Sequence, residues 1–403
     1  MKQVKKRKLI PYSFQTISKQ DIQSVVKVLK SLWITQGPQV AKFESMLTKV
    51  CGAKYAVAVS SGTAGLHLAC KALGVSYGDE VITSPNSFVA TSNSVLYCEG
   101  KPIFVDIEEE NLNIDSTLIK EKVTPKTCGI IPIHFAGHPC QMNDILKIAR
   151  KNGLFVLEDA CHALGARYQV GSKWYTVGSC SHSDAAVFSF HPVKSITTGE
   201  GGAVLTNRKD IYEKLLSLRA HGIVKNKKQF KNRNLARSKS KSSPWYYEMQ
   251  DLGFNYRITD IQCALGTSQL QRVLSFVRRR REIVKMYVQA FKNLPGIILP
   301  REQVWAKSAH HLFVLRLKLE FLKADRAEIF DAFKKEGLGV QVHYIPIHLQ
   351  PFYQKLGYQV GDFPVSEKYY QQAISLPLFP SMTNRDIAQI IRVVQQVVNC
   401  YLL

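Results

Sequence analysis

The sequence lacks several features that mark specialised protein classes. None of its apolar runs reaches the roughly 18 residues needed to span a bilayer. No hydrophobic region of the signal-peptide type follows the basic stretch from Met1 to Lys8, so we expect a cytoplasmic protein. The nine cysteines form no Cys-x-x-Cys pair and no Cys/His cluster at zinc spacing. This pattern excludes a disulfide framework, and it indicates reduced thiols in a core and no metal site.

Acidic residues are scarce. The chain has 31 Asp and Glu against 54 Lys and Arg, which gives a net charge of +23. The segment 225–243 contains no acid, and its basic residues are Lys225, Lys227, Lys228, Lys231, Arg233, Arg237, Lys239 and Lys241; a second basic cluster is Arg278 to Arg281. Such runs can bind nucleic acid, but the segment has few aromatic residues and no recognition motif. A solvated loop and helix face, or attraction of an anionic substrate such as a nucleotide diphosphate, are the alternatives.

The length of 403 residues and the 45% hydrophobic content are enough for a sizeable core in two lobes. Seven short apolar runs alternate with helical patterns, which predicts a mostly parallel seven-stranded sheet with helices on both faces. The runs lie near residues 55–59, 80–84, 102–105, 129–134, 154–158, 185–190 and 202–206.

Helical and strand patterns flank this sheet region. We expect an N-terminal helix over 18–32 and a linking helix over 258–292, then a smaller α+β lobe. The elements expected in that lobe are an antiparallel strand over 311–318 and helices near 324–336, 364–373 and 384–399. The chain is therefore expected to divide into a large domain of residues 1–270 and a small domain of residues 271–403.

Lys194 stands between an apolar run that ends at Ser189 and a glycine turn that leads to Gly202. A lysine held at the mouth of a sheet is partly desolvated, which lowers the pKa of its ammonium group and favours the free amine that forms a Schiff base with an aldehyde. A solvent-exposed position in a hairpin is the alternative for a lysine considered alone. Two further segments favour the chemical role.

The first is the junction from Ser61 to Ala64, where a short β-rich run leads into a helical pattern. Ser and Thr are good N-caps, and the free amides and positive dipole end of a helix bind phosphate. Gly62 lets the backbone approach a ligand closely.

The second is the run from Leu154 to Gly165, in which a buried-type strand ends in Glu158 and Asp159 and is followed by His162. An aspartate at this end of a parallel strand points into the usual ligand crevice. It can keep a pyridine nitrogen protonated, so that the ring accepts electrons, as in pyridoxal phosphate enzymes. Helix capping is the alternative for Asp159, and packing or capping for His162. Together the segments predict a phosphate cup, a ring-nitrogen acid and a Schiff-base lysine.

These motifs resemble the fold-type I pyridoxal phosphate enzymes, specifically the sugar aminotransferases of the DegT/DnrJ/EryC1/StrS family. The resemblance covers nearly the whole chain and rests on residues 33–38, 61–63, 87–91, 158–162, 188–194, 218–222 and 253–260. It implies an α/β fold with a large cofactor-binding lobe and a smaller C-terminal α+β lobe. Family relatives that dehydrate sugars have histidine in place of the lysine, so Lys194 argues against that chemistry.

The resemblance also implies roles around the cofactor ring. Lys194 is expected to form the Schiff base and then to move the proton between the cofactor carbon and the substrate carbon. Asp159 is expected to pair with the pyridinium nitrogen, Phe88 to stack on the ring, and His162 to lie near its phenolic oxygen.

The phosphate contacts implied by the resemblance come from two subunits. The backbone at Thr63 and Ala64 and the hydroxyls of Thr63 and Ser189 are expected to hold the phosphate. Asn255 is expected to reach it from the neighbouring subunit, which makes a homodimer the active unit.

Within the family, residues 244–251 and 342–351 look most like the transaminases of pseudaminic acid biosynthesis, a pathway to surface glycans. That subgroup implies transfer of the amino group of L-glutamate to C4 of a UDP-linked 4-keto-6-deoxy-N-acetyl hexose. His343, Tyr344 and His348 are candidate contacts to this substrate, with core packing as the alternative.

Two other functions stay open. One is an aminotransferase for another nucleotide-linked ketosugar, dTDP-linked or with a 3-keto group. The other is a non-catalytic nucleic-acid-binding regulator on the same fold. Two departures from the family pattern bear on the substrate: Ser195 follows the lysine, and the basic segment 225–243 is longer than the usual loop.

Overall fold

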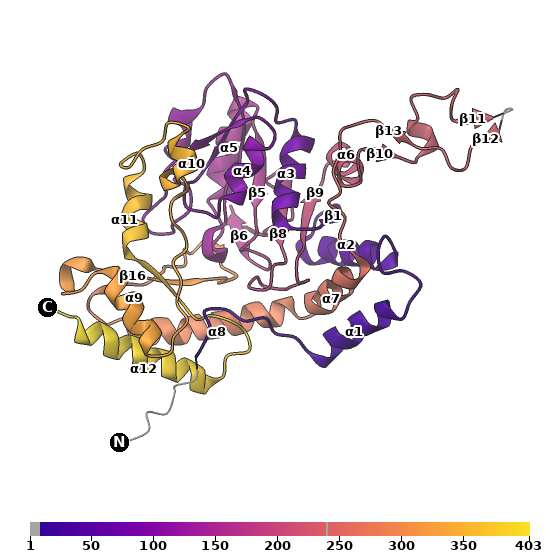
Figure 1. The fold of residues 1–403 in the computed structure, drawn as a ribbon. Coiled ribbons are helices and arrows are strands. Elements are labelled where there is room, and N and C mark those ends of the chain that lie inside the picture. Colours follow the sequence, from indigo (N-terminus) through magenta and orange to yellow (C-terminus); the bar gives the residue numbers. More distant parts are fainter. Residues whose placement is uncertain (1–8, 239–240) are drawn as a thin grey trace.

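The computed structural model describes residues 9–238 and 241–403, so the basic stretch Met1 to Lys8 and Lys239 of the basic segment lie outside it. A seven-stranded sheet forms the centre of the larger lobe (Figure 1). Its strands, in spatial order, are β1 (Tyr55–Val59), β9 (Gly202–Thr206), β8 (Ala185–Ser189), β5 (Phe155–Asp159), β4 (Thr127–Ile130), β2 (Glu80–Thr83) and β3 (Lys101–Phe104). β9 runs antiparallel to both of its neighbours, and the other strands are parallel to one another. The prediction of a mostly parallel seven-stranded sheet is confirmed.

Both faces of the sheet are buried. Along β8, Ala186 and Phe188 belong to one hydrophobic core, and Ala185 and Val187 belong to another on the opposite face. This is the period of two that a strand covered on both sides requires. The first core includes residues of α2 (Pro38–Cys51), α5 (Met142–Asn152) and α7 (Asp260–Leu270), and the second includes residues of α3 (Gly62–Leu73), α4 (Ala90–Leu96) and α6 (Lys209–Arg219).

The linking helix expected over 258–292 is two helices, and the single-helix prediction was wrong. α7 ends at Leu270, and α8 runs from Val273 to Phe291. Arg272 leaves the helical conformation with φ −107° and ψ 1°, and its guanidinium Nη2 lies 2.5 Å from Oδ2 of Asp21 in α1 (Lys19–Leu29). Neither glycine nor proline marks this break, so the helical periodicity continues across it.

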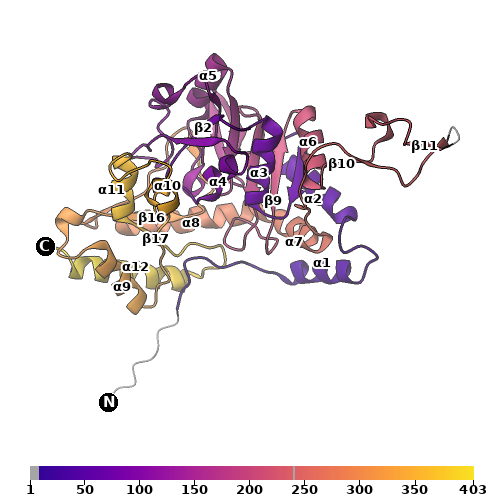
Figure 2. The ribbon, with the colours of Figure 1, turned by 45° about the horizontal axis from the view of Figure 1, so that its top comes forward.

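The smaller lobe packs around a separate hydrophobic core (Figure 2). Its sheet has the order β14 (Ile297–Ile298), β16 (Phe313–Leu317) and β17 (Ala373–Leu376), and its helices include α9 (Arg326–Lys335), α11 (Pro364–Gln372) and α12 (Asn384–Cys400). The short α10 (Pro351–Gln354) lies against the large lobe, where Tyr353 Oη is 2.7 Å from Ser92 Oγ of α4. The antiparallel strand and the three helices expected here are confirmed. Ile10 also lies in this core, while Val273 of α8 lies in the core of the large lobe. The boundary between residues 270 and 271 stays a prediction.

The strands of two further features were not expected from the sequence, although a solvated loop was one alternative for the basic segment 225–243, which lies in the second of them. One is a small sheet of β15 (Ala306–Lys307), β6 (Arg167–Val170) and β7 (Lys173–Thr176). The other is an arm that extends from the body in both views (Figures 1 and 2). β10 (Ile223–Val224) pairs with β13 (Glu248–Met249) at its base, and β11 (Arg237–Ser238) pairs with β12 (Lys241–Ser242) near its tip. Among the residues that the structure describes, no helix is both long and apolar enough to cross a membrane.

Candidate active site

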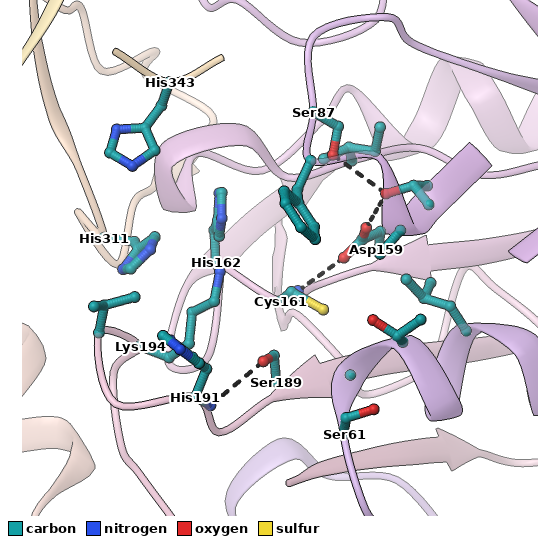
Figure 3. A pocket seen from close by; sticks show the side chains of 18 of the residues that line it. Ser61, Ser87, Asp159, Cys161, His162, Ser189, His191, Lys194, His311 and His343 are labelled. Atoms are coloured by element: carbon teal, nitrogen blue, oxygen red, sulfur yellow. Dashed lines mark hydrogen bonds between the residues drawn. The ribbon is translucent and has the colours of Figure 1, made fainter. Parts of the chain in front are cut away.

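A pocket of about 430 Å³ lies beside the carboxyl ends of β5 and β8 (Figure 3). Parallel strands end at the same edge of a sheet, so residues distant in the sequence meet there. The pocket is lined by Thr63, Phe88, Asp159, His162, Ser189, Lys194, His343 and Tyr344 among the residues expected from the sequence, and by Tyr12, Ser87, Thr91, Glu200 and His311 among others.

Lys194 lies on the connection 190–201 between β8 and β9. Because these strands are antiparallel, the chain turns back at the edge of the sheet and leaves the lysine at the pocket. The turn is held by backbone hydrogen bonds from Phe190 N to Gly201 O and from Lys194 N to His191 O, each 2.9 Å long. Burial lowers the pKa of Lys194, and the nearby Cys161 and Asp159 oppose this shift. The pKa therefore moves in the direction that favours a free amine.

Asp159 is the last residue of β5 and is buried. Thr91 Oγ1 donates a hydrogen bond of 2.6 Å to its Oδ2, and the amide of Cys161 donates one of 3.1 Å to its Oδ1. Turns rather than a helix follow over the described residues 160–165, so the helix-capping alternative for Asp159 is wrong. Its carboxylate is fixed by two donors at the wall of the pocket.

The start of α3 forms a polar corner of the pocket. The N-cap Ser61 accepts a hydrogen bond of 3.0 Å from the amide of Ala64 through its Oγ. The amides of Gly62 and Thr63 belong to the first turn and have no acceptor within the helix. A Cβ on Gly62 would lie 2.8 Å from Cβ of Ser189, so glycine is what allows the helix to begin directly against the end of β8. This corner can bind a phosphate, although Ser61 already engages the Ala64 amide.

Three histidines form the opposite wall, as Figure 3 shows for His162, His311 and His343. The rings of His162 and His311 lie 4.4 Å apart between centroids, and Tyr344 Oη lies 3.2 Å from His162 Nε2. Burial lowers the pKa of His162 and His311 well below the usual value, and it lowers the pKa of His343 to about 4. All three rings are therefore neutral near pH 7. Within the described part of the chain, the buried Nδ1 atoms of His162 and His311 have no hydrogen-bond partner.

The chain matches the DegT/DnrJ/EryC1/StrS aminotransferase family over residues 15–395. It belongs to this family. It is 41% identical over 396 residues to the spore coat polysaccharide biosynthesis protein SpsC of Bacillus subtilis, covering 98% of each chain.

Solved structures of aminotransferases have a similar fold. The fold matches Helicobacter pylori PseC, an aminotransferase involved in the biosynthesis of pseudoaminic acid, with a TM-score of 0.88 and 31% identity, covering 98% of this chain and all of the other. It also matches the PLP form of the putative sugar aminotransferase Spr1654 of Streptococcus pneumoniae, with a TM-score of 0.88 and 27% identity, covering 98% of this chain and 100% of the other. A PMP form of Spr1654 matches as well, so that protein is known with the cofactor in both states.

The residues of the pocket fit the family's cofactor. An amine with a lowered pKa, a fixed carboxylate and a helix N-terminus surround one space, as a pyridine ring with an aldehyde and a phosphate requires. The unpartnered Nδ1 of His162 is a buried polar atom whose hydrogen-bonding capacity is unused in the described chain, and a bound polar group can satisfy it.

Three expected residues lie elsewhere. Ala64 is buried behind the pocket surface. Asn255 is exposed on the segment that bridges to Ala220, outside this chain's own pocket. His348 is buried outside the pocket with Nε2 2.9 Å from Glu367 Oε1, which matches the packing alternative considered for it.

Tyr12 and His311 line the pocket but carried no expectation. Tyr12 comes from the N-terminal segment, where Ser13 Oγ is bonded to the carbonyl of Val193 next to the lysine. His311 stands just before β16. The one signal in the sequence is the polar pair His310 and His311 ahead of an apolar strand, and it does not say what the pair faces.

Proposed function

We propose that this aminotransferase moves the amino group of L-glutamate to C4 of a UDP-linked 4-keto-6-deoxy-N-acetyl hexose, with pyridoxal phosphate as its cofactor. The observation that carries the cofactor chemistry is the meeting of Lys194, Asp159 and the first turn of α3 in one pocket. When bound, pyridoxal phosphate supplies an electron sink for the carbon that loses its proton.

Different residues of the pocket have different proposed roles toward pyridoxal phosphate. Lys194 would hold the cofactor through its aldehyde, and its Nζ would carry the proton that moves during the reaction, which its lowered pKa favours. Asp159, held by Thr91 and the Cys161 amide, would keep a proton on the ring nitrogen. Phe88 and His162, which line the pocket, would contact the ring, and His162 is oriented by Tyr344.

The phosphate and the second subunit complete the proposal. The amides of the first turn of α3 and the hydroxyls of Thr63 and Ser189 bind the phosphate on this chain. Asn255 is exposed, as a residue that serves the neighbouring subunit must be. The active unit that we propose is a cytoplasmic homodimer in which each Asn255 completes the other site.

The likeness to PseC supports the choice of sugar, because that protein acts in pseudoaminic acid biosynthesis. The net charge of +23 favours a dianionic nucleotide substrate over a neutral one. His343 and Tyr344, which line the pocket, are the proposed sugar contacts.

An absorbance titration tests both halves of the reaction. The purified protein with pyridoxal phosphate is expected to show a visible band, L-glutamate to remove it, and the UDP-linked ketosugar to restore it. Lys194→Ala should lack the band, while Lys173→Ala, a matched change at an exposed position on β7, should keep it.

Each other outcome points to a named alternative. Restoration only by a dTDP-linked or 3-keto sugar would reject the UDP 4-keto substrate and keep the aminotransferase. No visible band, together with salt-sensitive binding to DNA, would favour the nucleic-acid-binding alternative.

A further inference from the structure

A second cavity, of about 580 Å³, lies between α8, the loop 300–302 and the residues that lead into β16. It shares no lining residue with the pocket that holds Lys194. Its volume lies within the range of about 300–1,000 Å³ that is usual for small-molecule sites. We refer to it below as the second cavity.

The floor of the second cavity is apolar and comes from both lobes. It is formed by the buried side chains of Leu112, Phe135, Val284, Leu312 and Val314. Such a floor binds the apolar body of a ligand by removing its surface from water.

The rim of the second cavity is charged. Arg281 Nη2 lies 3.3 Å from Glu302 Oε1, and Arg301 Nη1 lies 3.7 Å from Glu110 Oε1. Lys285 also lines the rim, and it has no carboxylate partner among the residues that the structure describes. Three cations therefore face two carboxylates, and the unmatched charge is the ammonium group of Lys285.

We propose that the second cavity binds a small amphipathic organic acid, with its apolar body on the floor and its carboxylate at Lys285. The apolar floor excludes a strongly hydrated ion such as free phosphate as the preferred ligand. The unmatched positive charge favours an anion over a neutral or cationic molecule of the same shape.

The same backbone separates this cavity from the active site. His310 and Leu312 line the second cavity, and His311 between them lines the pocket of Lys194. The segment is held by hydrogen bonds from His311 N to Ala136 O, 2.8 Å, and from Ala309 N to Gly137 O, 3.0 Å. Figure 3 shows His311 beside His162.

A ligand at the rim reaches this segment through two contacts. Arg281 donates a hydrogen bond of 2.7 Å to the carbonyl of Ser308, and Glu302 accepts one of 2.5 Å from the amide of Ser308. Arg281 lies one helical turn from Lys285 on α8, so a carboxylate at Lys285 also attracts Arg281 away from Glu302 and thereby acts on the residues that place His311. Occupation of the second cavity is expected to change the affinity of the active site for pyridoxal phosphate, a consequence that rests on the proposed function.

The site itself is tested without any cofactor. The fluorescent sulfonate 8-anilinonaphthalene-1-sulfonate is titrated into the full-length protein, and octanoate and octanol are then compared as competitors. We expect octanoate to displace the probe and octanol at equal concentration to leave it bound. Lys285→Glu, a change at an exposed position on α8, should lower the affinity for the probe by about tenfold, or about 1.4 kcal/mol. Lys335→Glu, at an exposed position on α9, should leave binding of the probe unchanged.

A second variant controls for binding elsewhere. Gln289→Trp places a bulky ring at an exposed lining position and should reduce probe binding without affecting the fold. Equal affinity in Lys285→Glu, Gln289→Trp and the unchanged protein would overturn the site, and equal displacement by octanol would overturn the assignment of an acid.

The coupling between the second cavity and the active site is measured separately. The dissociation constant of pyridoxal phosphate is measured by absorbance with and without saturating octanoate, and a change of about fivefold is expected. This change should disappear in Gln289→Trp. If octanoate leaves the dissociation constant of pyridoxal phosphate unchanged, the coupling between the two cavities is overturned, but ligand binding in the second cavity is not. If pyridoxal phosphate does not bind at all, the proposed function is overturned instead.

Discussion

Thr91 Oγ1 lies 2.6 Å from Oδ2 of Asp159 and donates a hydrogen bond to it, which ties α4 to the end of β5. Ser87 Oγ lies 3.2 Å from the same hydroxyl. Since a carboxylate only accepts, the proton of Thr91 points to Asp159 and Ser87 donates to Thr91. The relay fixes the carboxylate that the proposed chemistry needs.

Thr91→Val removes this donor and keeps the shape of the side chain. We expect kcat/KM for glutamate to fall by about tenfold, because a buried hydrogen bond to a charged group contributes about 1.5 kcal/mol or more. Steady-state kinetics and the absorbance of the bound cofactor measure this. Thr91→Ser restores the hydroxyl and should recover most of the activity, and equal rates for the Val and Ser variants would contradict the relay.

Asp159→Asn changes little in size but removes the charge that, in the proposed function, keeps a proton on the ring nitrogen. We expect kcat to fall by at least about a hundredfold, which corresponds to about 2.7 kcal/mol, with a circular dichroism spectrum like that of the unchanged protein. Asp144→Asn, on the exposed side of α5, is the matched control and should be neutral. Equal turnover by Asp159→Asn would count against the assignment of this residue.

His138 should make the protein sensitive to acid. Its Nδ1 lies 2.9 Å from the carbonyl of Pro139 and donates to it, while Nε2 accepts a hydrogen bond of 3.2 Å from the amide of Gln303, so both atoms are engaged in the neutral ring. Burial lowers its pKa to about 4. An unfolded histidine titrates near 6.5, so the unfolded chain binds more protons between these values. Stability is therefore present above about pH 6.5 and is lost as the pH falls towards 4.

Thermal unfolding of His138→Gln between pH 8 and pH 4.5 measures this contribution. The variant should be less stable at pH 8 by about 1 kcal/mol but should lose less on acidification, by up to about 1.4 kcal/mol per pH unit. His191→Gln, at an exposed position, should follow the unchanged protein. The same pH dependence in His138→Gln and the unchanged protein would exclude His138 as the cause.

The sequence predicts the sheet well because its strands are buried on both faces. Val57 and Ala58, for example, belong to opposite cores, so β1 has to be apolar throughout and is easily read. At the break between α7 and α8, Arg272 contacts Asp21, a residue 251 positions away, and such a contact leaves no local signal in the sequence. β6 and β7 were not predicted because they are short and half-exposed, with no continuous apolar run.

The residues of the site also fall into those that the sequence predicts and those that it does not. Lys194 and Asp159 stand next to strand ends, where the parallel topology itself directs them to one edge. His311 and Tyr12 reach the pocket only through the packing of the small lobe and the N-terminal segment against the large one. No local pattern of residues reports such long-range contacts, and the resemblance to the family assigned them no role.

Asn255 offers the sharpest test of the proposed dimer. If it serves the neighbouring site, a mixed dimer of Lys194→Ala and Asn255→Ala chains contains one site with both residues intact. Random exchange of two inactive homodimers should then restore about a quarter of the sites, since half of the dimers are mixed and each has one intact site of two. Activity is measured after the chains are mixed and allowed to exchange, with each variant treated alone as the control. If Asn255 acted within its own chain, no combination would contain an intact site and the mixture would stay as inactive as its parts.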